Sequence, residues 1–246
     1  MSISKREEVR AQRLQKKRKQ RMAALVGTGV VILVVVFLIG IPTLFDKYRP
    51  VGDFVMITPE AHPMENGLTI GNPDATVVVE VFEDFLCSAC KAYTETTEAE
   101  LLASDYILNG QVYYVFRNYP FEDDNSSFKF SDQTANASMC AMEQGRFWDY
   151  HAMLYANQDT SSAAAYADRR FVAYADALGL DMDQFNDCFE ANAYAAEIQA
   201  DVDLANQYGV NGTPSVFVNG VRITPGYVPS FEDLVNAIEA ALPANQ

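Results

Sequence analysis

The sequence predicts an α/β fold in which one mixed sheet carries helices on its faces and a helical subdomain is inserted between the two halves of the sheet. One observation predicts this domain, and a second predicts a membrane anchor ahead of it. The elements expected along the chain follow the order β–α–β, a helical block, and then β–β–α. An uncharged run of 20 residues near the N-terminus predicts one transmembrane helix ahead of this domain.

The chain has 246 residues, of which 49% are apolar and 21% are charged, as is typical of globular proteins. Residues 1–21 hold nine of the 18 Lys and Arg residues but only two of the 33 acids, so residues 22–246 carry 9 basic against 31 acidic groups. Such an acidic body offers no basic surface for phosphates, which argues against nucleic acid as a partner.

Residues 22–45 are expected to anchor the protein in the lipid bilayer of the cell membrane. Met22 to Ile41 is uncharged over 20 residues, and a rise of about 1.5 Å per residue spans the roughly 30 Å hydrocarbon core. The following "PTLFDKYRP" lacks a small-x-small cleavage site, so we expect an uncleaved single-pass anchor. Because positive residues stay in the cytoplasm, residues 1–21 are expected to form a cytoplasmic tail, with the catalytic domain outside, where disulfides persist.

Residues 46–72 are expected to form an extracytoplasmic linker, because they contain three Pro and three Gly residues. A short strand is expected within it near Phe54–Ile57. The folded domain is expected at 73–246, with its helical insertion at about 126–208.

The first half of the sheet is predicted from alternating, β-branched segments. "TVVVEVF" at 76–82 indicates a buried strand, and "QVYYVFRNY" at 111–119 indicates a second one that Pro120 ends. Between them, "CKAYTETTEAELLAS" at 90–104 has the apolar spacing of a helix. This arrangement predicts a parallel strand pair joined by a helix.

The insertion and the second half follow. From 131 to 208 the chain is rich in Ala, Met, Gln and Leu with almost no Pro or Gly, which predicts five helices. "GTPSVFVNGVRITPG" predicts two short strands around the turn Asn219-Gly220. "SFEDLVNAIEAAL" predicts a last helix with Ser230 as N-cap and Asp233 at the third helical position.

Cys87 and Cys90 form a Cys-x-x-Cys motif between the first strand and its helix. At that place the first sulfur lies near unpaired N–H groups and the positive end of the helix dipole, which stabilise a thiolate. A thiolate is the nucleophile of disulfide exchange, and a second cysteine can resolve the mixed disulfide. We therefore expect Cys87 to be the exposed, attacking residue and Cys90 the resolving one.

Two other uses of the cysteines remain open. Zinc could bind all four cysteines, but there is no second Cys-x-x-Cys, and His62 and His151 are not spaced with the cysteines, so no metal is expected. The motif could also be an inert structural disulfide, although so small a loop gains little stability.

A Thr-Pro pair opens the third main strand, in "NGTPSVF". In this order of elements Pro214 would lie beside the cysteine pair, and X-Pro bonds are the ones that adopt the cis form. A cis Pro214 would expose the backbone of Thr213, so that an extended substrate chain could pair with it.

The chain resembles the DsbA-like branch of the thioredoxin fold, in its membrane-anchored form, from about Asn72 to Leu242. The resemblance is carried by "FEDFLCSACKAY", "VFRNYPF", "CAMEQGRFWDYHAMLYANQ", "LGLDMDQFNDC" and "YGVNGTPSVFVNG". It implies a protein disulfide oxidoreductase without a bound cofactor, with Cys87 and Cys90 as redox centre and Thr213-Pro214 as a cis-proline loop. It also implies reduced exported proteins as substrates and a membrane quinone-linked partner that reoxidises the enzyme.

Two positions depart from the family. Many relatives have an acid six residues before the first cysteine, where this chain has Val81. Glu80 is expected on the opposite side of the strand, and Glu83 is not expected to reach the cysteines. The dipeptide Ser88-Ala89 lacks the His of strongly oxidising members, so the first cysteine is expected to be less acidic than theirs and the disulfide less oxidising.

Cys140 and Cys188 are expected to form a structural disulfide, because this is the pairing that leaves the redox pair intact. A disulfide that closes the long loop from Cys140 to Cys188 stabilises the fold by about 4 kcal/mol in the chain-entropy model. A resolving or relay role for this pair is the alternative.

The expected reaction is oxidation of dithiols in exported proteins. A disulfide reductase or isomerase on the same scaffold is the first alternative, and reduction potential separates it from an oxidase. The second is a non-catalytic module that holds exported chains at the cis-proline edge.

Overall fold

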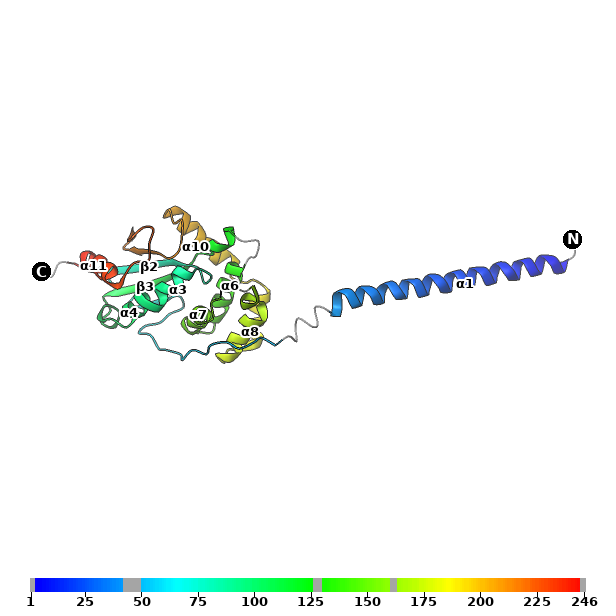
Figure 1. Cartoon of the computed structure of the whole chain (residues 1–246), viewed down its shortest axis with the longest axis horizontal. Helices are drawn as coiled ribbons and strands as arrows, with labels where there is room; N and C mark the ends of the chain where they lie inside the picture. Colours follow the sequence, from blue (N-terminus) through cyan, green and yellow to red (C-terminus); the bar gives the residue numbers. More distant parts are fainter. Residues whose placement is uncertain (1–2, 42–49, 126–129, 160–162, 244–246) are drawn as a thin grey trace. The chain divides into compact units, whose positions relative to one another are not determined.

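The computed structural model describes residues 3–41, 50–125, 130–159 and 163–243 (Figure 1). Residues 42–49 of the expected anchor and linker, and residues 126–129 and 160–162 of the expected insertion, lie outside the described residues. The chain divides into two compact units, Met1–Val51 and Gly52–Gln246.

The first unit is helical, with α1 (Ile3–Val35) continuing into the π-helical turn η1 (Val36–Gly40). The segment Arg13–Ile39 is long and apolar enough to cross a membrane, and it is the only such helix among the described residues. It overlaps the anchor expected at 22–45, and the helix starts earlier because part of the basic tail is helical as well.

The second unit is built on a five-stranded sheet with the order β1-β3-β2-β4-β5. Its strands are β1 (Thr69–Gly71), β2 (Val77–Glu83), β3 (Val112–Asn118), β4 (Ser215–Val218) and β5 (Val221–Arg222). β2 and β3 are parallel, and the other neighbouring pairs are antiparallel. The predicted α/β fold with one mixed sheet is therefore confirmed.

β2 lies at the centre of the sheet because its sequence suits burial on both faces. Val77, Val79 and Val81 are buried in the main core. Phe82 faces the other way and packs edge-on against Phe217 of β4, with ring centroids 5.7 Å apart. The C-terminal end of β2 therefore lies inside the protein, and the cysteine motif follows shortly after it.

The connection from β2 to β3 consists of α3 (Ser88–Tyr93), η2 (Thr94–Glu98), α4 (Ala99–Leu102) and α5 (Asp105–Leu108). The sequence predicts one regular helix over 90–104, whereas the structure starts the helix at Ser88 and interrupts it with the π-helical turn η2. Such turns are frequent at functional sites. This one carries Thr94 and Glu98, whose side chains take part in the candidate site.

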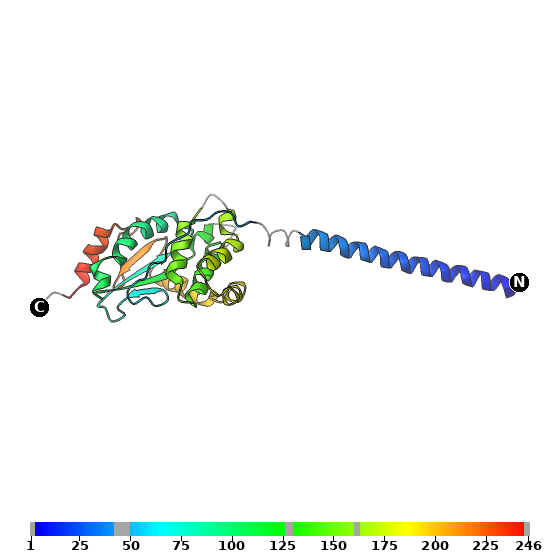
Figure 2. The same ribbon diagram turned by 90° about the horizontal axis from the view of Figure 1, so that it is seen from below.

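The helical insertion follows β3. It contains η3 (Phe121–Asn125), α6 (Phe130–Met142), α7 (Phe147–Ala156), η4 (Ala163–Tyr166), α8 (Asp168–Ala177), α9 (Met182–Glu190) and α10 (Ala195–Gln207). The longer helices α6 to α10 agree with the five predicted from composition. Helices α6 to α8 lie at one end of this unit and α11 (Phe231–Ala241) at the other, with the sheet between them (Figures 1 and 2).

The C-terminal elements also follow the prediction. Asn219 and Gly220 both have positive φ, at 49° and 77°, in the turn between antiparallel β4 and β5. Ser230 caps α11: its Oγ accepts the Asp233 N–H at 3.1 Å, and the Asp233 carboxylate accepts the Ser230 N–H at 2.9 Å. This reciprocal capping box satisfies two N–H groups at the start of the helix.

Residues 52–68, which we name the strap, differ from the expected linker. Phe54 packs edge-on against Tyr174 of α8 at 5.2 Å, and the Val55 backbone exchanges two hydrogen bonds with the Asn157 side chain, at 2.7 and 2.9 Å. The strap thus belongs to the folded unit, because its apolar side chains pack on the helical insertion. The strand expected at Phe54–Ile57 does not form; a strand forms instead at β1.

Candidate active site

Cys87 lies where β2 turns into α3 and is the N-cap residue of that helix, with φ −75° and ψ 119°. The turn is fixed by backbone bonds, because the Cys87 N–H donates to Asp84 O at 3.0 Å and the Lys91 N–H donates to Cys87 O at 3.2 Å. Gln158 from the helical insertion also donates to Cys87 O, at 3.0 Å. The motif is therefore held by both halves of the domain.

Both motif cysteines are present as free thiols and both are buried, with Cys87 8% exposed and Cys90 fully buried. The expectation that Cys87 is exposed is therefore wrong. The loop before β4 covers it: the Cys87 thiol donates to Thr213 O at 3.3 Å, although the two residues are 126 positions apart. Cys87 is still the more accessible of the two sulfurs.

The Thr213-Pro214 peptide bond is cis. It directly precedes β4, which pairs antiparallel with β2, so the loop is brought to the end of β2 that carries the motif. The structure thus brings Cys87, Thr213 and Pro214 together at the C-terminal end of β2. The Thr213 hydroxyl is buried beside the Cys87 sulfur.

The surroundings of the two sulfurs separate their pKa values. The Cys90 thiol, the Thr213 hydroxyl and the backbone N–H groups of Ala89 and Cys90 stabilise the Cys87 thiolate and, against the cost of burial, lower its pKa to about 6. Burial first, and then the Cys87 sulfur and the Glu83 charge, raise the pKa of Cys90 well above its ordinary value. At neutral pH Cys87 is a thiolate and Cys90 a thiol, which gives one nucleophile and one protonated leaving group.

The Ser88-Ala89 dipeptide contributes no charge to this effect. The low pKa of Cys87 comes instead from hydrogen bonds to the thiolate, among them those at the first turn of α3. A histidine is therefore not needed for the thiolate to predominate at neutral pH.

Glu83 is the main correction to the expected site. It is 1% exposed at the end of β2, and its charge acts on both motif sulfurs. Its Oε2 accepts the Tyr155 hydroxyl at 2.8 Å and the Thr94 hydroxyl at 3.4 Å. The strand extends one residue past the predicted end and buries this side chain. Glu80 lies on the other face and binds Arg117, with Oε1 2.7 Å from Nε.

Asp84 is a second buried acid beside the motif. Its carboxylate accepts the N–H of Leu86 and the N–H of Glu122, both at 2.8 Å, and so ties the motif turn to η3. Burial outweighs these bonds and raises the pKa of Asp84 to about 7. Sequence reasoning did not select this residue, although it lies three positions before Cys87 and directly after Glu83.

Glu98 of η2 is the third buried acid, at 2% exposure. Its Oε1 accepts the Tyr114 hydroxyl at 2.7 Å, and its Oε2 lies 3.8 Å from His151 Nε2. Burial raises the pKa of Glu98 to about 7 and lowers that of His151 to about 3, so His151 is neutral at physiological pH. The histidine is a buried residue packed among aromatic rings, among them those of Phe116 and Tyr155.

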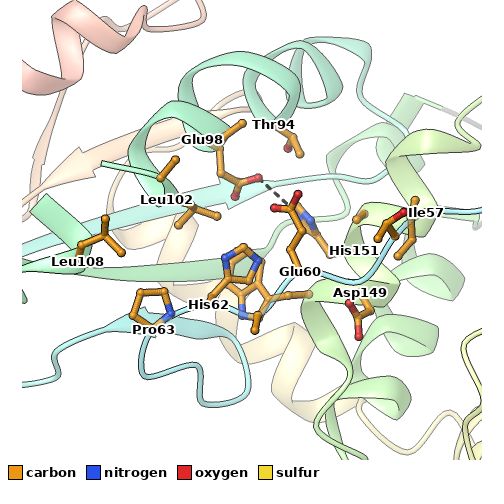
Figure 3. Close-up of a pocket in the computed structure, with 16 residues that line it drawn as sticks. Ile57, Glu60, His62, Pro63, Thr94, Glu98, Leu102, Leu108, Asp149 and His151 are labelled. Atoms are coloured by element: carbon orange, nitrogen blue, oxygen red, sulfur yellow. Dashed lines mark ion pairs between the residues drawn. The ribbon is translucent and has the colours of Figure 1, made fainter. Parts of the chain in front are cut away.

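Glu98 and His151 line a pocket of about 470 Å³ between the strap, α4 and α7 (Figure 3). The strap contributes Glu60 and His62, and the His62 ring packs edge-on against Trp148 at 6.0 Å. Figure 3 shows Glu98 and Glu60 entering this pocket from opposite sides. The pocket does not include either motif cysteine.

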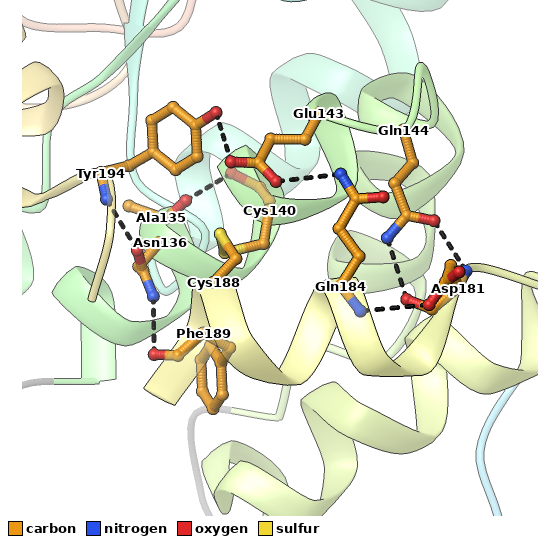
Figure 4. Close-up of a disulfide and its surroundings, with 11 residues drawn as sticks. Ala135, Asn136, Cys140, Glu143, Gln144, Asp181, Gln184, Cys188, Phe189 and Tyr194 are labelled. Carbon is orange, nitrogen blue, oxygen red and sulfur yellow. Dashed lines mark hydrogen bonds between the residues drawn. A yellow bond between two sulfur atoms is a disulfide. The ribbon is translucent and has the colours of Figure 1, made fainter. Parts of the chain in front are cut away.

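Cys140 of α6 and Cys188 of α9 are bonded to each other, with Cα atoms 5.8 Å apart (Figure 4). Around them, Asn136 donates to Phe189 O at 3.2 Å, so the two helices are also joined by polar contacts. Because this pair is bonded, the four cysteines do not gather around one metal ion.

A family model described as thioredoxin matches residues 64–240. Over 152 residues the chain is 37% identical to the Na⁺/H⁺ antiporter NhaA 3 of Salinispora tropica, covering 62% of this chain and 21% of the antiporter. It thus spans about a fifth of that relative. Over 176 residues it is 27% identical to the probable disulfide bond formation protein D of Bacillus anthracis, covering 71% of this chain and 77% of that protein.

Solved structures share the fold. Oxidised BdbD from Bacillus subtilis has a TM-score of 0.63 at 22% identity, covering 77% of this chain and 98% of that one. The α-DsbA1 of Wolbachia pipientis has a TM-score of 0.60 at 20% identity, covering 73% and 92%. The chain therefore belongs to the thioredoxin family, and it shares its fold, including the helical insertion, with these DsbA and BdbD structures.

Proposed function

We propose that this protein is an extracytoplasmic thiol–disulfide oxidoreductase that oxidises dithiols of exported proteins through a Cys87–Cys90 disulfide. The observation that carries the proposal is the pair of opposed pKa shifts at the motif: Cys87 is held as a thiolate and Cys90 as a thiol. A stabilised thiolate is a good leaving group, and it favours the reduced form of the enzyme, which makes its disulfide an oxidant.

The reaction begins with the oxidised enzyme. A substrate thiolate attacks Cys87 Sγ, the Cys87–Cys90 bond breaks, and Cys90 leaves and takes up one proton. The second substrate thiol releases its proton to solvent and attacks the mixed disulfide, and Cys87 leaves as a thiolate. Two electrons pass from the substrate to the enzyme, and one disulfide bond replaces another.

The cis-proline loop supplies the proposed substrate contact. The Thr213 carbonyl lies 3.3 Å from Cys87 Sγ, at the entrance to β4. An extended chain that paired with this backbone would bring its cysteine to Cys87, and the main-chain bonds would tolerate many substrate sequences.

We place the domain outside the cytoplasmic membrane, with residues 22–45 as anchor and the N-terminus inside. The apolar helix and the nine basic residues of the first 21 support this topology. A membrane quinone-linked protein is the proposed electron acceptor that reoxidises the cysteine pair. Cys140–Cys188 is proposed as a structural bridge, because it joins two helices of the insertion.

The test uses the full chain in detergent and a peptide with two cysteines, whose oxidation is followed by mass. We expect stoichiometric oxidation of the reduced peptide by the wild type when its Cys87–Cys90 disulfide is formed beforehand, and none by Cys87→Ala or Cys90→Ala, because neither variant can hold that disulfide. With the disulfide form of the peptide, Cys90→Ala should form a mixed disulfide through Cys87, because the Cys87 thiolate breaks the peptide S–S bond and no second enzyme thiol resolves the product. The matched control is the double variant Cys140→Ala with Cys188→Ala, which keeps the reaction. Unchanged oxidation by Cys87→Ala would overturn the proposal. If the wild type binds the peptide but does not oxidise it, the alternative is favoured in which the domain is a non-catalytic module that holds exported chains.

A further inference from the structure

Two consecutive amide side chains at the end of α7 each hold a different segment of the chain. Asn157 is the C-cap residue of this helix, and its side chain binds the strap at Val55, 102 positions away. Gln158, the next residue, binds the turn that carries Cys87, 71 positions away. The strap and the cysteine turn are therefore fastened to the same point of the helical insertion.

Gln158 holds the cysteine turn by two carbonyl groups. Its Nε2 donates to Phe85 O at 2.8 Å and to Cys87 O at 3.0 Å, and a Gln amide nitrogen carries one hydrogen for each. The two carbonyls belong to the peptide units before Leu86 and after Cys87. The bonds therefore fix the orientation of both units, and with it the direction in which the Cys87 side chain leaves the backbone.

The Cys87 carbonyl is also where α3 begins, because it accepts the Lys91 N–H at 3.2 Å. The backbone N–H groups of Ala89 and Cys90, in the first turn of this helix, stabilise the Cys87 thiolate. Hydrogen bonds weaken steeply when donor and acceptor are misaligned. A rotation of the peptide unit after Cys87 would move this turn relative to the sulfur, so Gln158 supports the thiolate without bonding to it.

Asn157 ties the strap to the last turn of α7. Its Oδ1 accepts the Val55 N–H at 2.7 Å, and its Nδ2 donates to Val55 O at 2.9 Å and to Met153 O at 2.9 Å. The amide thus pairs with the strap backbone much as a neighbouring strand would, and it closes the end of the helix as well. The docked strap therefore fixes the direction of the chain at the point where Gln158 begins.

We propose that Gln158 is a positioning residue for the Cys87 sulfur, and that the docked strap, through Asn157, keeps Gln158 in place. The proposal rests on the proposed function, in which Cys87 is the sulfur that the substrate attacks and that later leaves as a thiolate. Because the strap follows the expected anchor in the chain, the segment that tethers the domain also helps to set the reactivity of its cysteine.

The first test compares Gln158→Met with the wild type, each as the reduced full chain in detergent. Methionine is similar in length but has no N–H group, so the variant removes both hydrogen bonds and keeps most of the packing. From the thiolate absorbance we expect the pKa of Cys87 to rise from about 6 to about 7, a tenfold loss of acidity. In glutathione buffers at pH 7 the equilibrium should shift about fivefold toward the enzyme disulfide, which is about 20 mV.

Gln144→Met is the matched control. Gln144 belongs to the same insertion, and its Nε2 also donates to a backbone carbonyl, that of Asp181 at 3.1 Å, at the start of α9 (Figure 4). A hydrogen bond with a purely structural role lowers the urea midpoint when it is lost but does not change the acidity of Cys87. We therefore expect Gln144→Met to keep the wild-type pKa and potential, whatever its effect on stability.

The part of the strap is tested from the strap itself. Val55→Pro removes the N–H group that Asn157 accepts, whereas Val55→Ala keeps this group and shortens only an exposed side chain. We expect Val55→Pro to raise the pKa of Cys87 by about half a unit, a threefold loss of acidity, and Val55→Ala to leave it unchanged. Asn157→Ala removes the same contact from the side of α7 and should act like Val55→Pro, which keeps the test valid if the proline variant does not fold.

Two results would overturn the proposal. A wild-type pKa and potential in Gln158→Met would remove the positioning role, and a wild-type pKa in both Val55→Pro and Asn157→Ala would remove the role of the strap. In either case the proposed function stands as long as the wild type oxidises the dithiol peptide. A wild type that does not oxidise the peptide contradicts the proposed function itself, while the pKa values of the variants still decide the roles of Gln158 and the strap.

Discussion

The low pKa of Cys87 predicts that the reduced protein gains stability as pH rises. The surroundings of this thiol lower its pKa from an ordinary value of 9.0 to about 6. A group whose pKa is depressed by folding stabilises the folded state above its unfolded pKa, and this stabilisation is lost as pH falls through the folded pKa. The contribution is close to zero at pH 5 and about 3 kcal/mol at pH 8, from 1.36 kcal/mol per pKa unit.

The assay is urea unfolding of the reduced full chain in detergent at pH 5 and pH 8, followed by the fluorescence of the single, buried Trp148. Glu98 and Asp84 have pKa values of about 7 and so titrate in the same range, and burial raises the pKa of Glu83 as well, so the reduced Cys87→Ser variant is measured in parallel and subtracted. We expect the difference in unfolding free energy between the two proteins to grow by about 3 kcal/mol from pH 5 to pH 8. A difference that stays constant within about 0.5 kcal/mol, or a thiolate absorbance that titrates near the ordinary pKa of 9.0, would refute the reasoning.

Three further changes should alter stability, each measured as the shift in urea midpoint. The double variant Cys140→Ala with Cys188→Ala should lose about 4 kcal/mol, because the bond closes a loop with a sequence separation of 48 residues; a loss below about 1 kcal/mol would contradict this. Arg117→Ala leaves the mostly buried carboxylates of Glu80 and Asp201 without their cation and should cost about 1–3 kcal/mol, and Arg117→Lys less. Tyr155→Phe removes the 2.8 Å hydrogen bond to the buried Glu83 carboxylate and should cost about 1–3 kcal/mol. An unchanged urea midpoint would contradict this, and would mean that water takes the place of the hydroxyl.

The parts of the fold that sequence predicts are those set by local patterns. Alternation in β2 and β3, the composition of the helical insertion, and the Ser230 capping box each depend on residues close together in the chain, and each agrees with the structure. The position of the cysteine motif is equally local, because a strand before it and a helix after it suffice to place it. A strand of three residues such as β1 carries too short a pattern to be recognised.

The buried acids could not be predicted in the same way. Whether Glu83 faces the cysteines depends on Tyr155, which is 72 residues away and reaches it from the helical insertion. The strap shows the same limit: its Pro and Gly content fits a free linker equally well, and only packing of Phe54 against Tyr174 distinguishes the two. Contacts between distant segments decide both features, and neither leaves a local signal in the sequence.

The central claim is that Cys87 and Cys90 are an oxidising redox pair. The most direct measurement equilibrates the full chain in glutathione buffers of stepped potential, traps free thiols by alkylation and locates them by mass. We expect Cys87 and Cys90 to titrate together as one two-electron couple, closer to about −120 mV than to about −270 mV, while Cys140 and Cys188 stay bonded. A shared potential near about −270 mV would reverse the direction of electron flow, and a pair that never exchanges would contradict the account.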